Sequence, residues 1–470
     1  MSKKLVADLI VDYLERRDVK YVFGLCGHTV IGMLDALSRS KKLHFVNTRH
    51  EAIASTAADG YARVTHKAAV AMCHLGPALT NVLTGVANAS LDSIPMVVIA
   101  GDVPSYYFGR HPHQEVQMHE DGDQYSMLKP VCKRCWRVDD VEALPYILDR
   151  AFRLAESGRP GPVLVDIPMD MFSREVEEDL WSRTYRDSHA PVKPALDPAA
   201  VKAIAKKLVE AERPGLREKI LQAKADFKKS NEAISSDSRF PMTPQRILKD
   251  VKEVIPEDAL IFTDVGWNKN GVAQQFDITV PGSIHHTSGL ANMGFGASAV
   301  LGGKLAAPDR ICITLTGDGG FGVQPSCLAT AAQDGIAVTW VVMNNSAFGT
   351  IAGLENANYH HKFGTVFQTP DGASYTPNWA DVAKAYGIES IRCSSAEEFK
   401  PAMEKAMEAN RAGRPFLVEA PMENIVVPTP GCWNINDIYT PNELVKEGKL
   451  VKQENGQYVA PSHSKSHNAK

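Results

Sequence analysis

Two polar motifs in the second half of the sequence carry groups that a metal ion and a phosphate need. Gly317-Asp318-Gly319 comes just after the apolar run Ile311–Leu315, and Asn344-Asn345 follows the next apolar run, Ala337–Met343. One carboxylate oxygen and one amide oxygen suit a hard divalent cation, with phosphate oxygens and water completing its shell. Main-chain N–H groups of Gly319 and Gly320 would meet phosphate at a helix start. Gly-Asp-Gly alone is usually only a turn, but this spacing predicts a site for a cation and a phosphate-bearing ligand.

Polar side chains also follow three apolar runs in the first half. His28 closes the segment Gly24-Leu25-Cys26-Gly27-His28, Glu51 comes after the run 43–47, and His74 ends the run 68–74. Histidine and glutamate are common proton-transfer groups near neutral pH. A packing or surface histidine and a buried structural glutamate are the alternatives that the residue types leave open.

Alternating helical and strand patterns predict that His28, Glu51 and His74 meet at one edge of a sheet. Strands are predicted at 21–25, 43–47, 68–74 and 96–100, and helices at 6–14, 29–40, 52–64 and 80–91, with a turn at Gly76-Pro77. The chain is expected to open directly into the first of these helices. Such alternation predicts a parallel sheet covered on both faces, with ligands at the carboxyl ends of its strands.

The same alternation begins again near Pro244. Strands are predicted at 259–263, 311–315 and 337–343, and a single helix at about 321–334 joins the last two. A second doubly wound domain is therefore predicted. Between the two halves, the charged segment Glu175–Met242 contains two helical stretches, near 198–212 and 216–230, and no convincing strand.

Bulk composition excludes several classes of partner. The chain has 470 residues, 44% of them hydrophobic and 23% charged, which predicts two or three globular domains. A net charge of −4 with mixed signs gives no reason to expect nucleic acid or a membrane surface as a partner. The longest apolar runs are strand-length, and no signal peptide is evident. Eight scattered cysteines are typical of a reduced, intracellular protein, so a cytoplasmic location is expected.

With these motifs in place, the sequence resembles the thiamine-diphosphate enzyme family, in the branch that includes acetolactate synthase, benzoylformate decarboxylase and pyruvate decarboxylase. Gly317-Asp318-Gly319 with Asn344-Asn345 matches the family's diphosphate motif, and Arg49-His50-Glu51 is similar to its activating-glutamate motif. The resemblance implies thiamine diphosphate and Mg²⁺ as cofactors. It also implies that the metal is held by Asp318, Asn345 and the main-chain carbonyl of Ala347.

The resemblance further implies roles for residues around the cofactor. Glu51 would share a proton with the pyrimidine nitrogen N1′ and so activate the C2 ylide. His28, His74 and Gln114 would face the reacting C2 carbon. Within Ser288–Gly294, Met293 would support the bent cofactor and the carbonyl of Ala291 would accept from the 4′-amino group. The implied cofactor contacts are Gly27, Asn81, Asn268, Ala291, Met293, Gly319, Gly320 and Phe348.

Family members commonly carry a third, nucleotide-binding-like domain between the two halves, and no such domain fits here. The expected organisation is a pyrimidine-binding domain at 1–175, a truncated helical linker at 176–242, a diphosphate- and Mg²⁺-binding domain at 243–447 and a disordered tail at 448–470. The missing domain contributes much of the flavin site in FAD-binding acetolactate synthases. FAD is therefore not expected.

Three functions remain open from the sequence. The first is a lyase or carboligase acting on a 2-oxo acid, acetolactate synthase-like. The second is hydrolysis of a cyclic 1,2-dione, because His28, His74 and Gln114 together are most like cyclohexane-1,2-dione hydrolase. The third is a non-catalytic paralogue impaired by loss of the middle domain. The resemblance implies a homodimer or homotetramer in which Glu51 and Asp318 of one site come from different chains.

Overall fold

Buried strands alternate with helices through both halves of the chain, as the sequence patterns predict. The computed structural model describes residues 3–117, 123–179, 196–211, 215–424 and 441–454, together with residues 456, 458, 459 and 461. These residues fall into two units. The first unit contains Met1–Asn345 and Thr376–Glu423, and the second contains Ser346–Tyr375 and Asn424–Lys470.

The first sheet of the first unit is six-stranded and parallel throughout, in the order β3-β2-β4-β5-β7-β6. Strands β4, β5 and β7 are buried along their whole length, as expected where helices cover both faces. The strands are β2 (Tyr21–Gly24), β3 (His44–Asn47), β4 (Ala69–Cys73), β5 (Met96–Asp102), β6 (Cys135–Arg137) and β7 (Pro162–Pro168). The helices are α1 (Val6–Arg16), α2 (Ile31–Arg39), α3 (Glu51–Thr65), α4 (Gly76–Asp92), α5 (Leu144–Glu156) and α6 (Met169–Phe172), with 3₁₀ turns η1 (His28–Val30), η2 (Ser105–Tyr107) and η3 (Gln124–Leu128).

The second sheet repeats this topology in the order β10-β9-β11-β12-β14-β13, again with parallel pairs only. When the six strands of each sheet are numbered in chain order, both sheets have the order 2-1-3-4-6-5 from one edge to the other. The strands are β9 (Leu260–Thr263), β10 (Ile284–His286), β11 (Cys312–Gly317), β12 (Thr339–Asn344), β13 (Glu389–Arg392) and β14 (Phe416–Pro421). The helices are α10 (Pro244–Val254), α11 (Trp267–Gln275), α12 (Phe295–Ala306), α13 (Asp318–Phe321), α14 (Cys327–Asp334), α16 (Trp379–Ala385) and α17 (Phe399–Arg411). Two doubly wound parallel sheets are thus confirmed.

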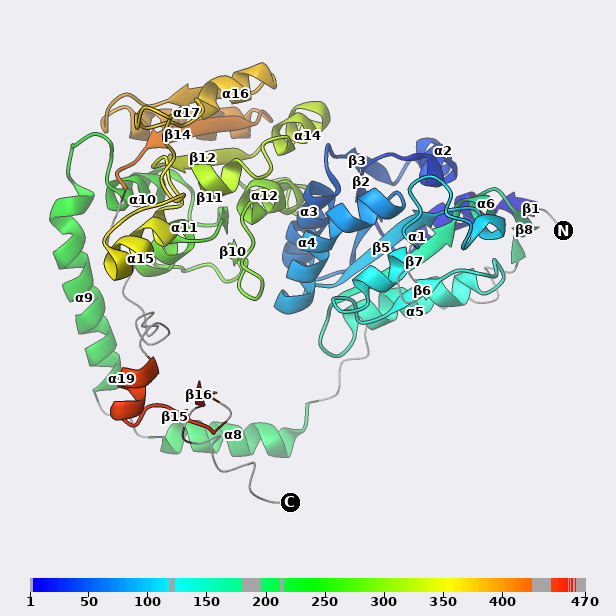
Figure 1. The fold of residues 1–470 in the computed structure, drawn as a ribbon, viewed down its shortest axis with the longest axis horizontal. Coiled ribbons are helices and arrows are strands. Elements are labelled where there is room, and N and C mark those ends of the chain that lie inside the picture. Colours follow the sequence, from blue (N-terminus) through cyan, green and yellow to red (C-terminus); the bar gives the residue numbers. More distant parts are fainter. Residues whose placement is uncertain are drawn as a thin grey trace. The chain divides into compact units, whose positions relative to one another are not determined.

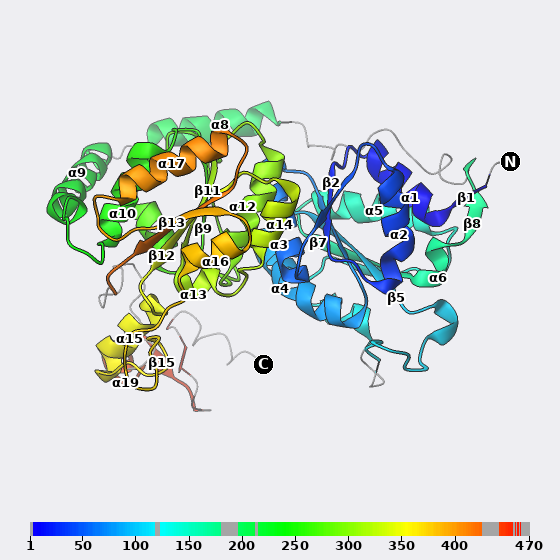
Figure 2. The same cartoon turned by 90° about the horizontal axis from the view of Figure 1, so that it is seen from above.

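Three apolar clusters form the core of the first unit. One combines side chains of α3 and α4 with those of α12, α14 and α16, and so joins the two sheets. The second lies on the other face of the first sheet, under α1, α2 and α5. The third lies on the other face of the second sheet, under α10 and α17. Figure 1 and Figure 2 both show α3 and α12 side by side between the sheets.

The contact between α3 and α12 depends on glycine. A Cβ atom on Gly60 would lie 2.0 Å from the carbonyl oxygen of Ala299, and one on Gly302 would lie 1.8 Å from that of Ala57. No real Cβ can come so close to a main-chain oxygen, so each glycine permits a helix approach that alanine would forbid.

Several sequence predictions need correction. The chain does not open directly into a helix, because β1 (Lys3–Leu5) comes first and pairs antiparallel with β8 (Glu175–Glu177). The expectation of no strand in the middle segment is therefore wrong at β8. Helix α4 begins at Gly76 rather than after a turn, since Pro77 stands at a helix start where no N–H donor is needed. Two short helices, α13 and α14, replace the single helix predicted at 321–334.

The predicted linker helices are present as α8 (Pro198–Glu210) and α9 (Leu216–Ser235). Asp197 caps α8 by accepting from the N–H of Ala199 at 2.9 Å. Lys224 and Lys228 of α9 both pair with Asp277, at 3.2 and 2.7 Å. Among the described residues, no helix is both long enough and apolar enough to cross a bilayer.

The second unit contains α15 (Gly349–Tyr359), α19 (Pro441–Lys446) and a short antiparallel pair of β15 (Val451–Lys452) with β16 (Tyr458–Val459). The prediction of a disordered tail is wrong for these two strands. Residues 462–470 lie outside the described part of the chain.

The glycine contact yields a stability prediction. Gly302→Ala should lower the free energy of unfolding by about 1–3 kcal/mol or more, because α12 must move away from α3 to admit the methyl group. Urea unfolding followed by circular dichroism measures the change. Gly161→Ala is the control, since its Cβ would meet only the Lys133 side chain, at 3.2 Å. Equal unfolding midpoints for the two variants would contradict the close contact.

Candidate active site

The carboxyl edge of each sheet carries one group of the predicted site residues. In the first sheet, His28 follows β2, Glu51 follows β3 and His74 follows β4. In the second sheet, Asp318 follows β11 and Asn345 follows β12. Parallel strands present all their carboxyl ends at one edge, so each group gathers residues distant in sequence.

Glu51 is the first residue of α3 and is only 6% exposed. One of its carboxylate oxygens accepts from Nδ2 of Asn81, on α4, at 2.9 Å. The N-terminal end of a helix favours a carboxylate. Burial, and then the charge of Glu51, raise the pKa of the Cys73 thiol well above its usual range. The structure therefore brings together Glu51, a predicted catalytic residue, and Asn81, a predicted cofactor contact.

His74 is held in one orientation by two hydrogen-bond partners. Its Nδ1 lies 2.9 Å from Oγ1 of Thr29 and accepts from the Thr29 N–H at 3.4 Å. Because Nδ1 accepts, the ring hydrogen is on Nε2, which donates to Oε1 of Gln114 at 2.9 Å. His74 and Gln114, both predicted site residues, are thus in direct contact. Thr29, which the motifs did not indicate, fixes the tautomer.

The rings of His28, His74 and His113 form a cluster beside the hydrogen bond between His74 and Gln114. The ring of His28 lies 4.4 Å from that of His74 and 6.5 Å from that of His113. Burial, followed by the charges of His74 and His113, lowers the pKa of His28. A Cβ on Gly27 would lie 2.4 Å from Cγ of His74, so only glycine lets this loop approach the ring so closely. His113 is an additional member that sequence motifs did not assign.

In the second sheet, Asp318 and Asn345 come from adjacent parallel strands, in which Gly317 pairs with Met343. Asp318 is 2% exposed and Asn345 is half-buried. The neighbouring Asn344 has a structural task, because its Nδ2 donates to Glu419 at 2.7 Å and to Thr376 at 3.0 Å.

Three of the predicted cofactor contacts, Asn268, Gly319 and Gly320, lie at this edge of the second sheet. A Cβ on Gly317 would meet Nδ2 of Asn268 at 3.4 Å, which places Asn268 beside the end of β11. Gly319 and Gly320 lie in α13. A Cβ on Gly320 would come within 3.1 Å of both carboxylate oxygens of Asp264. Ala347 and Phe348 belong to the second unit, where Ala347 bridges Val366 and the Phe348 N–H donates to Thr365 at 2.9 Å.

The segment Ser288–Gly294 is shaped by a strained residue and a buried carboxylate. Ala291 has φ of 54°, a left-handed conformation uncommon for a non-glycine residue. Met293 is 40% exposed. The carboxylate of Asp264 accepts from the N–H groups of Val265 at 2.8 Å and Gly294 at 3.0 Å. Asp264 therefore fixes the end of this segment. The sequence placed Asp264 after a predicted strand but did not indicate this role.

The donor set fits a hard cation. A carboxylate and an amide oxygen from neighbouring strand ends are ligands that Mg²⁺ accepts, with the remaining positions left for phosphate and water. Within the described ranges, no group of three or more His, Cys, Asp or Glu side chains could hold a metal by itself. A cation at Asp318 would therefore need oxygen ligands of other kinds, such as the amide of Asn345, main-chain carbonyls, phosphate or water.

Comparison with known protein families agrees with this geometry. Residues 4–127 match the N-terminal TPP binding domain of thiamine pyrophosphate enzymes, and residues 264–420 match the C-terminal TPP binding domain. The two matches together span more than half of the chain and include Glu51 in the first and Asp318 with Asn345 in the second. The chain belongs to the thiamine pyrophosphate enzyme family.

This thiamine pyrophosphate enzyme is similar to acetolactate synthase large subunits. It is 26% identical to a probable acetolactate synthase large subunit of Methanocaldococcus jannaschii, over 90% of this chain and 93% of the relative. It is 27% identical to the isozyme 1 large subunit of Escherichia coli, over 88% and 93%. The first alignment runs over 568 positions, more than the 470 residues of this chain, so the relative contains residues that this chain lacks. That difference agrees with the missing middle domain.

Asp264 provides a pH-dependent prediction. Burial raises the pKa of its carboxyl to about 6, against hydrogen bonds that lower it. The native state therefore holds this proton more tightly than the unfolded chain does. The resulting stabilisation is present below the unfolded pKa and is lost as pH rises through about 6, which lowers the free energy of unfolding by about 3 kcal/mol. Asp264→Asn keeps an oxygen for Val265 and Gly294 and removes this titration. Urea unfolding at several pH values between about 4 and 7 should show a flatter profile for Asp264→Asn than for the wild type.

The exposed Asp309→Asn variant is the matched control and should retain the wild-type profile. Parallel profiles for wild type and Asp264→Asn would show that the buried carboxyl does not titrate in this range.

Proposed function

We propose that this protein is a thiamine-diphosphate-dependent lyase or carboligase acting on a 2-oxo acid, with chemistry of the acetolactate synthase kind. The observation that carries the proposal is the pair of edges described above: a buried glutamate at the first sheet and an Asp–Asn pair at the second. Similarity to acetolactate synthase large subunits at 24–27% identity supports the reaction class.

Each group of residues has a separate task in this proposal. Asp318, Asn345 and the carbonyl of Ala347 would hold Mg²⁺, while Gly319, Gly320 and Asn268 would contact the diphosphate end. When bound, thiamine diphosphate would supply a nucleophilic carbon that adds to a carbonyl group and a thiazolium ring that delocalises the electron pair left by a broken C–C bond. Met293 would support the cofactor, and the carbonyl of Ala291 would accept from its amino group.

Proton movement falls to the residues of the first sheet. Glu51 would exchange a proton with the cofactor pyrimidine, and Asn81, at 2.9 Å, holds its carboxylate in place. The rings of His28 and His74 would exchange protons with the substrate oxygen. Gln114 positions His74 through their hydrogen bond.

The decisive experiment begins with the cofactor. Purified protein should gain thermal stability on addition of thiamine diphosphate with Mg²⁺, because a ligand that binds only the folded state stabilises it. A panel of 2-oxo acids then identifies the substrate by release of carbon dioxide and by product analysis. Protein that binds the cofactor yet converts neither a 2-oxo acid nor a cyclic 1,2-dione would favour a non-catalytic paralogue.

Glu51→Gln should keep the fold but slow turnover by about 10²–10⁴-fold, because the proton relay to the cofactor is lost. Deuterium exchange at the cofactor C2 position, followed by NMR, should slow in parallel. The exposed Glu404→Gln is a control outside the site. Wild-type exchange in Glu51→Gln would refute the role proposed for Glu51.

The assembly can be tested with two inactive chains. If Glu51 and Asp318 of one site belong to different subunits, mixing Glu51→Gln with Asp318→Ala should restore part of the activity, since a mixed dimer contains one intact site. Subunit exchange must be confirmed by mass spectrometry. Failure of complementation after exchange would place both residues of a site in one chain.

Hydrolysis of a cyclic 1,2-dione is the second candidate, and the cluster of His28, His74 and His113 favours it. His28→Ala and His74→Ala should then change the products formed from a 2-oxo acid and from a cyclic dione while leaving thiamine diphosphate affinity unchanged. Calorimetry measures the affinity and chromatography measures the products. A variant that no longer binds the cofactor would make that histidine structural.

A further inference from the structure

The segment 287–291 is largely exposed, yet its backbone includes an unfavourable conformation. Thr287 is buried, and the four residues that follow it are exposed. Ala291 has φ of 54°, and this left-handed conformation is unfavourable for a residue that carries a Cβ atom. Because little of the segment is buried, its hydrogen bonds must determine the shape of its backbone.

One chain of hydrogen bonds runs from α3 through α4 to Ala291. Nδ2 of Asn88, on α4, donates to the carboxylate of Asp59, on α3, at 2.9 Å. Oδ1 of Asn88 accepts from the hydroxyl group of Thr287. Oγ1 of Thr287 in turn accepts from the N–H of Ala291 at 3.1 Å. The side chains of Asp59, Asn88 and Thr287 are all buried, so removing one of them leaves a buried polar partner unpaired.

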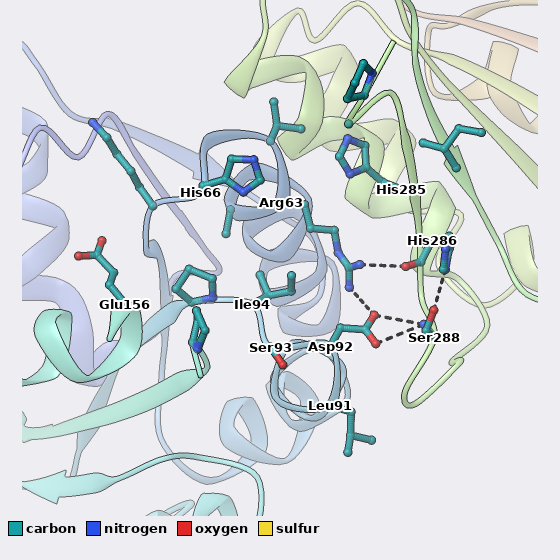
Figure 3. A pocket seen from close by; sticks show the side chains of 18 of the residues that line it. Arg63, His66, Leu91, Asp92, Ser93, Ile94, Glu156, His285, His286 and Ser288 are labelled. Carbon is teal, nitrogen blue, oxygen red and sulfur yellow. Dashed lines mark hydrogen bonds and ion pairs between the residues drawn. The ribbon is translucent and has the colours of Figure 1, made fainter. Parts of the chain in front are cut away.

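A second set of bonds holds the backbone from His286 to Gly289. Arg63 donates to the carbonyl oxygen of His286 at 2.8 Å and to the carboxylate of Asp92 at 2.7 Å. Asp92 accepts from the N–H groups of Ser288 at 3.1 Å and Gly289 at 2.7 Å. Figure 3 shows Arg63 reaching from its helix towards His286 and Asp92, with Asp92 bonded onward to Ser288.

Asp92 is suited to this task because it is a carboxylate. Burial raises the pKa of Asp92, but hydrogen bonds from Arg63 and from the N–H of Gly289 outweigh burial and lower the pKa below its usual value. An ionised carboxylate only accepts hydrogen bonds. Asp92 can therefore serve the Arg63 side chain and two main-chain N–H groups at once.

The segment is thus held at both ends. The partners of 286–291 belong to α3 and α4, and Asp264 holds Gly294 at the other end. A Cβ on Gly289 would lie 2.5 Å from Cβ of Leu91, so glycine lets the segment lie directly on the end of α4. Exposed N–H groups could bond to water instead, so these contacts determine the path of the backbone more than they stabilise the core.

We propose that Asn88, Asp92 and Thr287 are positioning residues, which hold the backbone of Ala291 in the shape that lets its carbonyl accept from the amino group of the cofactor. This inference rests on the proposed function, in which that carbonyl is the acceptor. The three side chains act through the backbone. When one of these bonds is lost, Ala291 can relax to a right-handed or extended conformation, which changes the direction of its carbonyl.

Amide hydrogen exchange of the full chain, followed by mass spectrometry without thiamine diphosphate, tests the bonds themselves. In the wild type, the N–H groups of Ser288, Gly289 and Ala291 should be protected although these residues are exposed. Thr287→Val should speed exchange at Ala291 by about three- to tenfold, and Asp92→Ala should do so at Ser288 and Gly289. Thr287→Ser keeps the hydroxyl group and should retain the wild-type rate. Unprotected wild-type amides, or unchanged rates in both variants, would overturn the proposal.

Deuterium exchange at the cofactor C2 position tests the positioning role. With saturating thiamine diphosphate and Mg²⁺, Thr287→Val and Asp92→Ala should slow this exchange by about three- to tenfold, because the amino group is held less well. Calorimetry should show a similar loss of cofactor affinity, and Thr287→Ser should restore both quantities. Thr84→Val, which removes an exposed hydroxyl group from α4, is the control and should behave as the wild type.

Melting followed by circular dichroism establishes that each variant is folded. If Thr287→Val does not fold, Asp92→Ala decides by the same measurements, since its acceptor serves exposed N–H groups. A wild-type rate of C2 exchange in a folded variant with faster amide exchange would overturn the positioning role, as would an equal loss in Thr84→Val. Failure of the wild type to bind thiamine diphosphate would refute the proposed function, whereas wild-type binding with unaffected variants would refute only the positioning role.

Discussion

The close crossing of α3 and α12 is the contact on which the first unit depends. Gly60 and Gly302 bring main-chain atoms of the two helices together, and an alanine at either position would collide with a carbonyl oxygen. Helix α3 begins at Glu51, and α12 begins directly after Gly294, the last residue of the predicted cofactor segment. The crossing therefore sets the positions of the two helix starts beside which Glu51, proposed to transfer protons, and Ser288–Gly294, proposed to support the cofactor, lie.

Buried polar groups fix the loops that follow the strands. Asp264 holds Gly294, Glu419 accepts from Asn344 and from the N–H of Ala380, and Gln124 accepts from the N–H of Gly76 while its amide donates to Asp166. Each of these partners would leave a buried N–H unpaired if it were lost, which costs more than the bond gains. Hydrogen bonds to buried polar groups thus help to order the loops at the predicted site.

Loss of the middle domain leaves both carboxyl edges complete. The two sheets share one strand order, and the residues proposed to contact the cofactor follow strands within each half. The segment between the halves adds α8 and α9, and α9 is anchored by its lysines at Asp277. This chain therefore retains the residues proposed to contact the cofactor without the segment that its longer relatives contain.

The sequence by itself determined the two parallel sheets and the strand ends at which Glu51, His28, His74, Asp318 and Asn345 stand, because short-range periodicity and motif spacing are local properties. The sequence patterns did not predict strands β6, β7, β10, β13 and β14. They also missed the pairing of β1 with β8, which joins residues far apart in sequence. Only the tertiary structure decided that Thr29 and Gln114 fix the tautomer of His74, that Asp264 anchors Gly294 and that Asp92 links Arg63 to the N–H of Ser288. Each of these contacts connects different elements, and no repeating pattern in the chain encodes which distant partner a buried polar group will find.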